Sequence, residues 1–74
     1  MVSNEIALKF GKRVSLLRKK LEITQEELSF RSGLNRTFVG EIERGEKNAT
    51  IVTIDKLAKG LNVSLKELFD YIMS

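Results

Sequence analysis

The chain has 74 residues and a formal net charge of +3, and it contains neither cysteine nor histidine. At this length we expect a single domain over residues 1–74 with a small core, to which an interface with a second copy would add stability, and the basic balance suits a polyanionic partner. Because Cys and His are absent and no apolar stretch is long, the sequence predicts no disulfide framework, no metal site and no cofactor, and it favours neither a membrane span nor a signal peptide.

The first predicted helix runs from about Glu5 to Leu21. Its apolar face repeats at i, i+4, i+7 and i+11 and consists of Phe10, Val14, Leu17 and Leu21. Five basic side chains lie largely off that face: Lys9, Lys12, Arg13, Lys19 and Lys20. No segment of the chain alternates clearly enough for a β-strand, so we predict an all-α fold, a compact bundle of five helices.

The second helix has clear start and stop signals. Thr24 is placed to cap residues 25–32, and Glu27 stands at the third helical position, so we expect the two residues to form a reciprocal capping box. Gly33 follows, where a left-handed residue is needed and glycine has no Cβ to clash. We therefore predict that this helix ends at Ser32.

A third helix follows after about three residues, which is the spacing of a helix-turn-helix. Asn35 can cap it, and the helix extends from there to about residue 44. Val39 and Ile42 point to one side of the helix. The other side carries Thr37, Glu41 and Arg44. The two capped helices and their tight turn predict a motif that places its second helix in the major groove of DNA.

The fourth predicted helix begins after a turn that Gly45 permits. Thr50 caps this helix, which ends near Gly60. We expect its buried face to consist of Ile51, Ile54, Leu57, Ala58 and Leu61.

The fifth predicted helix starts at a second capping box, formed by Ser64 and Glu67. Its apolar stripe exceeds what the terminal helix of a small monomer needs, so we interpret it as a two-fold dimer seam. Closing the core of one chain is the alternative. The predicted dimer interface comprises Val52, Leu65, Leu68, Phe69 and Ile72.

The start of the third helix holds the residues that best suit base recognition. Arg36 is the first candidate, because a guanidinium matches the O6 and N7 acceptors of guanine. Thr37 can offer a hydroxyl, or a methyl group to thymine. The alternative is that both are ordinary solvated residues at a helix start, and the surrounding motif favours the DNA contact.

Other residues are candidates for contacts to the DNA backbone. Gln25 begins the second helix, where free amides attract a phosphate, and Lys47 and Asn48 can clamp the backbone from the other side. Phe38 is a candidate for a thymine methyl or a sugar, with core packing as the alternative. The complete predicted DNA-binding set is Gln25, Asn35, Arg36, Thr37, Phe38, Glu41, Arg44, Lys47 and Asn48. Glu46 opposes this role unless its carboxylate meets a neighbouring arginine or a cytosine N4 donor.

From about Phe10 to Phe69, the sequence resembles the Cro/CI-type (XRE) helix-turn-helix domain, which has the lambda repressor-like fold. Residues 35–48, NRTFVGEIERGEKN, resemble the controller proteins of restriction-modification systems, in which an Arg-Thr-aromatic start and an Ile-Glu-Arg-Gly-x-basic-Asn end are usual. Two positions depart from that pattern. Ser29 replaces a small alanine and needs its hydroxyl satisfied, and Phe38 replaces the commoner tyrosine, so it has no hydroxyl to offer to DNA.

The resemblance implies a partly buried ion pair between Arg18 and Glu43, which would orient the third helix. It further implies a cytoplasmic, nucleoid-associated bacterial regulator that binds palindromic promoter DNA as a homodimer through the fourth and fifth helices, about 51–73. RNA polymerase is a further candidate partner. For a controller protein, the resemblance implies binding upstream of its own gene and the endonuclease gene, with activation first and repression as more dimers bind.

Two other classes of function compete with this interpretation. An enzyme is disfavoured, because the only candidate groups are carboxylates such as Glu26, Glu27, Glu41 and Glu43, which capping, solvation or an ion pair explain better. An antitoxin or phage-type repressor, whose main partner is another protein, is the stronger rival. The neighbouring open reading frame would distinguish the controller from the antitoxin.

Overall fold

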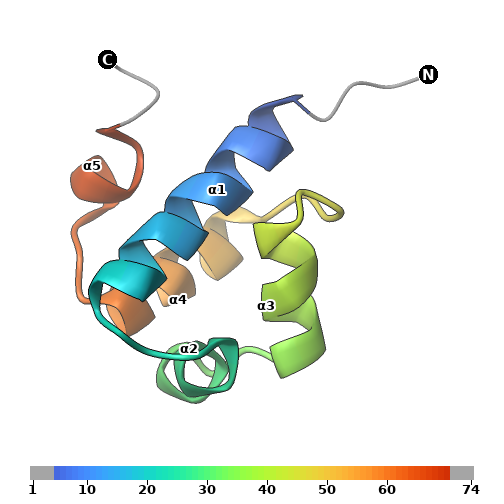
Figure 1. Cartoon of the computed structure of the whole chain (residues 1–74). Helices are drawn as coiled ribbons and strands as arrows, with labels where there is room; N and C mark the ends of the chain where they lie inside the picture. The colour runs from blue at the N-terminus through green and yellow to red at the C-terminus, as the bar shows by residue number, and fades with distance from the viewer. Residues whose placement is uncertain (1–4, 71–74) are drawn as a thin grey trace.

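The computed structural model describes residues 5–70, which form five helices and no strand. They are α1 Glu5–Lys20, α2 Gln25–Ser32, α3 Arg36–Glu43, α4 Ile51–Leu61 and α5 Leu65–Leu68. In Figure 1, α1 crosses the front of the molecule with α3 beside it, α4 lies behind α1, and α2 is seen nearly end-on below them. The predicted all-α class is confirmed, and the predicted bounds of α2 match the structure.

The core draws on every helix. Val14, Leu28, Val39, Leu57 and Leu68 come from α1 to α5 in turn, and each is completely buried. The second helix packs against both α3 and α4, while α1 packs mainly against α3. Helices as short as α2 and α3 are marginal alone, so this shared core holds them in place.

The caps that start the helices follow the sequence closely. The hydroxyl Oγ1 of Thr24 accepts from the backbone N–H of Glu27 at 3.0 Å, and Thr50 accepts from Thr53 at 3.1 Å. Ser64 and Glu67 form the full capping box. The box expected at α2 is only half present, because the Glu27 carboxylate pairs with Arg31 at 3.0 Å instead.

The first and third helices cross at Gly11, where their backbones touch. A Cβ at this position would overlap the carbonyl oxygen of Ile42 and lie 2.7 Å from that of Glu43. Only glycine permits this approach, so Gly11 fixes how closely α3 lies against α1. Before the start of α3, Gly33 has the predicted left-handed conformation, with φ of 74°, and sets the turn from α2.

Three predicted buried or interface residues are placed differently by the structure. Leu21 is 40% exposed, because α1 has ended at Lys20 and the chain turns away from the core. Ile51, the first residue of α4, is 85% exposed, because no other segment within residues 5–70 packs over it. Leu68 is completely buried within one chain, so it is a core residue and not a free dimer surface.

Candidate nucleic-acid interface

The third helix presents one packed face and one open face. Val39 and Ile42 are almost completely buried, whereas Arg36 and Thr37 are exposed at its start. Glu41 lies between these extremes and is half-buried. The N-terminal turn is therefore the exposed part of this helix, as the sequence predicts.

Asn35 caps the exposed turn that begins α3. The Oδ1 atom of Asn35 accepts hydrogen bonds from the backbone N–H groups of Thr37, at 2.7 Å, and Phe38, at 3.4 Å. This carbonyl oxygen is thus used as a helix cap. Arg36 forms no ion pair within residues 5–70, and its guanidinium is free to meet an acceptor. Phe38 is half-buried and packs against the core, which favours the packing alternative over a DNA contact.

A network behind α3 holds the helix to α1 and α2. Nε of Arg18 donates to Oε2 of Glu43 at 2.6 Å, and Nη2 donates to Oε1 at 3.0 Å. The Arg18 and Glu43 side chains are only 12% and 5% exposed. The guanidinium also donates to the carbonyl of Ile23 at 2.8 Å, next to the start of α2. The structure therefore contains the ion pair that the family resemblance implied.

Gln25 belongs to the same network. Its Nε2 atom donates to Oε1 of Glu43 at 2.9 Å, so the side-chain N–H group assigned to DNA has a partner inside the protein. The backbone at the start of α2 is still open, because only Thr24 caps it. Sequence reasoning missed the Gln25–Glu43 contact, since the two residues lie 18 positions apart.

At the far end of α3, Arg44 and Glu46 form a two-point pair. Nε of Arg44 donates to Oε2 of Glu46 at 2.8 Å and Nη2 donates to Oε1 at 3.2 Å, with both side chains more than half exposed. The hydrogen bonds from Arg44 lower the pKa of the Glu46 carboxyl, and the same bonds raise the pKa of Arg44. The acidic residue that opposed DNA binding in the sequence is thus directed at a neighbouring arginine.

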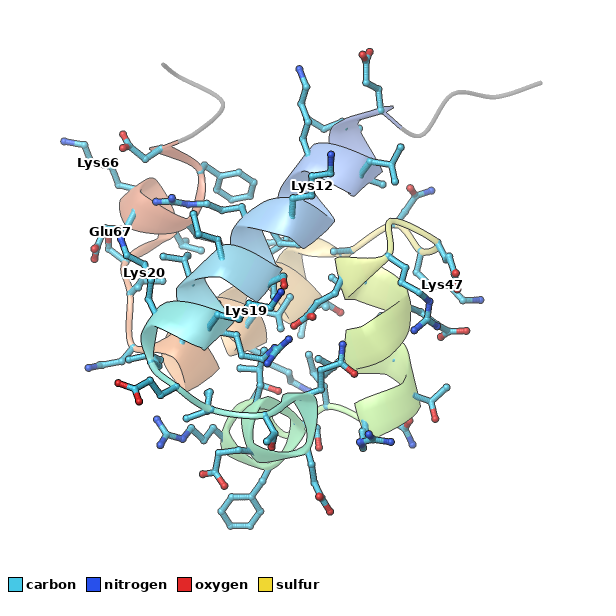
Figure 2. All side chains as sticks on the ribbon, viewed as in Figure 1. Lys12, Lys19, Lys20, Lys47, Lys66 and Glu67 are labelled. Atoms are coloured by element: carbon cyan, nitrogen blue, oxygen red, sulfur yellow. The ribbon has the colours of Figure 1, made fainter. Side chains whose placement is uncertain are left out.

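The loop between α3 and α4 carries Lys47 and Asn48, both exposed. Figure 2 shows Lys47 beyond α3, on the side of that helix away from α1. The loop then reaches Thr50, the cap of α4. The two predicted backbone contacts therefore lie together at one end of α3.

The predicted dimer residues fall into three groups. Val52 and Leu65 are 63% and 49% exposed, and with Ile51, Ile54, Asp55 and Phe69 they line an apolar groove between α4 and α5. Phe69 is half-buried, with its ring centroid 5.6 Å from that of Phe10. Leu68 lies in the core, as described above, and Ile72 lies outside the described residues. Sequence reasoning also missed Arg13, whose Nη2 donates to the carbonyl of Glu67 at 2.7 Å and ties α1 to α5.

Ser29 meets the requirement set by its position in α2. Its hydroxyl Oγ donates to the carbonyl of Glu26 at 3.0 Å. The hydroxyl at this half-buried position is therefore not left without a hydrogen-bond partner.

The arrangement of these helices matches a known family. The family model described as HTH_3, helix-turn-helix, covers residues 14–68. The chain belongs to the HTH_3 helix-turn-helix family. The match spans all of α2, α3, α4 and α5, so it includes the helix-turn-helix and every residue that lines the apolar groove except Phe69.

Relatives of this HTH_3 chain include controller proteins of restriction-modification systems. It is 39% identical over 71 residues to the control protein C.BamHI of Bacillus amyloliquefaciens, covering 95% of this chain and 88% of that protein. The crystal structure of the controller protein C.AhdI from Aeromonas hydrophila is similar with a TM-score of 0.85 and 45% identity, over 88% of this chain and 98% of that one. The controller protein C.Esp1396I, solved as a tetramer in complex with its natural 35 base-pair operator, has a TM-score of 0.85 and 33% identity, over 90% and 88% of the two chains.

Within residues 5–70 of this HTH_3 chain, no helix has the length and apolar character to cross a membrane.

Proposed function

We propose that this protein is a restriction-modification controller, a sequence-specific regulator of transcription that binds double-stranded DNA as a homodimer. The observation that carries the proposal is the way α3 is held. Hydrogen bonds from Arg18 of α1 and Gln25 of α2 to Glu43 fix the position of α3, while Arg36 and Thr37 are exposed at its start. A pre-organised helix with free polar groups at its N-terminal turn suits the major groove.

The proposed contacts divide into base reading and backbone positioning. Arg36 would donate to O6 and N7 of a guanine, and Thr37 would contact the neighbouring base. Glu41 would accept from a cytosine N4 or remain solvated. The backbone amides that begin α2 would bind one phosphate, and Lys47 with Asn48 would hold the backbone at the other end of α3.

The proposed dimer uses the apolar groove between α4 and α5. Val52, Leu65 and Phe69 remain from the predicted interface, and Ile51 joins them because it is 85% exposed beside them. A two-fold axis through this groove would present two copies of α3 to a palindromic operator. Half-sites of such operators lie about one helical turn apart, roughly 34–36 Å.

We further propose that the protein regulates without catalysing a reaction and acts on DNA in the bacterial cytoplasm. The complex of C.Esp1396I with its operator is a tetramer, which supports loading of two dimers on one operator here. RNA polymerase is a further proposed partner, on the basis of the resemblance to controller proteins. The controller relatives favour this function over the antitoxin.

Selection of bound DNA from random duplexes tests the proposal. We expect a palindromic consensus from the unsubstituted protein. Arg36→Ala should relax the preference at one symmetric base position and cost about 1–3 kcal/mol per half-site. Arg31→Ala, an exposed arginine of α2 that pairs with Glu27, is the matched control and should leave the consensus unchanged. Recovery of no consensus sequence would refute the proposed function.

A further inference from the structure

The positive charge of this protein is concentrated on one helix. Six of the 13 basic residues lie in α1, together with one acidic residue, Glu5. The rest of the chain holds seven basic and nine acidic residues and is therefore net negative. The two helices of the helix-turn-helix, α2 and α3, carry two basic residues and four acidic ones. The helix-turn-helix itself is therefore net negative, although its proposed partner, DNA, is a polyanion.

The lysines of α1 are not neutralised within the described part of the chain. Four ion pairs form among residues 5–70, and Arg18 is the member that α1 supplies. Lys9, Lys12 and Lys19 are exposed, with no carboxylate oxygen within 4.0 Å of their ammonium groups in residues 5–70. These three positive charges are therefore available to a negatively charged partner that contacts α1.

Three of these lysines, Lys9, Lys12 and Lys19, form a line that we name the α1 strip. Lys9 and Lys12 border one shallow hollow together with Leu16. Lys12, Leu16 and Lys19 border a second hollow, which extends to Glu43 of α3. At about 1.5 Å of rise per residue, the strip is roughly 15 Å long. The hollow that Lys12 and Lys19 share therefore reaches Glu43, the residue that anchors α3.

Figure 2 shows how the strip relates to the other proposed backbone contact. Lys12 and Lys19 lie along α1, while Lys47 lies across α3 from them. The recognition helix is therefore flanked by cations on both sides in this view. Leu16, half exposed between the lysines, adds an apolar surface of the kind that suits the sugar of a nucleotide.

We propose that the α1 strip is a second, sequence-independent contact to the DNA backbone, beside the base-reading turn of α3. This inference rests on the proposed DNA-binding function. Ammonium groups are point charges that suit phosphates better than base edges. Duplex DNA carries one negative charge per roughly 1.7 Å of axis, so a strip of this length meets several phosphates. The strip supplies the attraction that the acidic α2 and α3 lack.

The test is the salt dependence of DNA binding by the full chain. In the variant Lys12→Gln/Lys19→Gln, the charges are removed while helix propensity is retained. We expect weaker binding to the selected operator and to a random duplex by the same factor, with the specificity ratio unchanged. The slope of log affinity against log salt should become shallower by about 0.9 for each phosphate that the variant no longer neutralises.

The matched control is Lys56→Gln/Lys66→Gln, which removes two exposed lysines from α4 and α5. Its net charge equals that of the test variant, so long-range electrostatics are matched. Sedimentation should confirm that both variants keep the oligomeric state of the unsubstituted protein, and the control should keep its slope.

Two outcomes would overturn the inference alone while the unsubstituted protein still selects its operator. The first is equal slopes for the test and control variants. The second is loss of transcriptional activation with unchanged DNA affinity, which would assign the strip to a protein partner. Absence of any DNA binding by the unsubstituted protein would instead refute the proposed function itself.

Discussion

The guanidinium of Arg18 bridges α1 and α3 through two bonds to Glu43, with Nε 2.6 Å from Oε2 and Nη2 3.0 Å from Oε1. Because both side chains are nearly buried, neither charge is well solvated when its partner is missing. The pair is therefore a structural constraint on the recognition helix, and it dictates how variants of either residue should behave.

Arg18→Met should destabilise the fold by about 3–5 kcal/mol, because it leaves the Glu43 carboxylate buried without its cation. The double variant Arg18→Met/Glu43→Met should recover much of that loss. Urea unfolding followed by circular dichroism measures both. The control Arg31→Met removes the exposed pair with Glu27 and should cost less than about 1 kcal/mol. Equal losses for Arg18→Met and Arg31→Met would contradict the structural role.

Gly11→Ala should separate α1 from α3. The added Cβ would overlap the carbonyl oxygen of Ile42. This oxygen belongs to the backbone of α3, so the clash is relieved only if the two helices move apart. We expect a net loss of about 1–3 kcal/mol in unfolding free energy, typical of overpacking, although alanine is the better helix former. Operator affinity should fall as α3 shifts. Lys20→Ala, an exposed change at the end of the same helix, is the control; stability equal to that control would refute the close contact.

Glu46→Gln should free Arg44 to contact phosphates. The pKa of Glu46 is lowered by its bonds to Arg44, so the carboxylate stays ionised at neutral pH and protonates at a lower pH than an unpaired glutamate. Mild acidification from neutral pH should therefore leave the pair intact. The substitution should strengthen binding to random duplexes more than to the operator, which lowers the specificity ratio. Glu26→Gln, exposed on α2, is the comparison, and identical binding by the two variants would argue against a masked Arg44.

Leu65→Asp should convert the dimer into a monomer that remains folded. The side chain is 49% exposed in one chain, so the charge is tolerated there, but it would be buried without a partner in the proposed interface. Sedimentation at several concentrations measures the change. Phe30→Asp alters a side chain that is 83% exposed outside the groove, and it should leave the dimer intact. A monomeric unsubstituted protein would remove the basis of this prediction.

Leu68→Asp, in contrast, should unfold the chain. Leu68 is completely buried in a single copy, so an aspartate there would be desolvated whether or not a dimer forms. We expect a loss above about 4 kcal/mol, which is comparable to the total stability of a domain of this size. Circular dichroism should show loss of helix at 25 °C. A folded Leu68→Asp monomer would place Leu68 at the interface after all.

The helices could be predicted from the sequence because their signals are local. The Thr24 and Ser64 caps act over three residues, and Gly33 decides its own conformation, so no distant contact was needed. The capping box at α2 failed for a local reason as well. Glu27 has two competing partners, the backbone of its cap and Arg31 one turn later, and periodicity does not rank them.

The site was less predictable because its contacts span the chain. Gln25 and Glu43 lie 18 positions apart, and Arg13 lies 54 positions from Glu67. No spacing rule joins such residues, and the family resemblance supplied only the Arg18–Glu43 pair. Helical periodicity likewise predicts the apolar face of a helix, but it does not show how much of that face other helices cover. Periodicity therefore places Ile51 in the core, although its side chain is exposed.

In α3, the residues that hold the helix in the fold are different from the residues proposed to read DNA. Arg18, Glu43 and Gly11 maintain the scaffold, whereas the Arg36 and Thr37 side chains form no hydrogen bond or ion pair within residues 5–70. Substitutions at the exposed turn therefore carry little folding penalty, and new operator preferences can arise in few mutational steps. A lineage with this architecture can follow the drift of its target sequence, and two such regulators in one cell can become mutually independent without redesign of the fold.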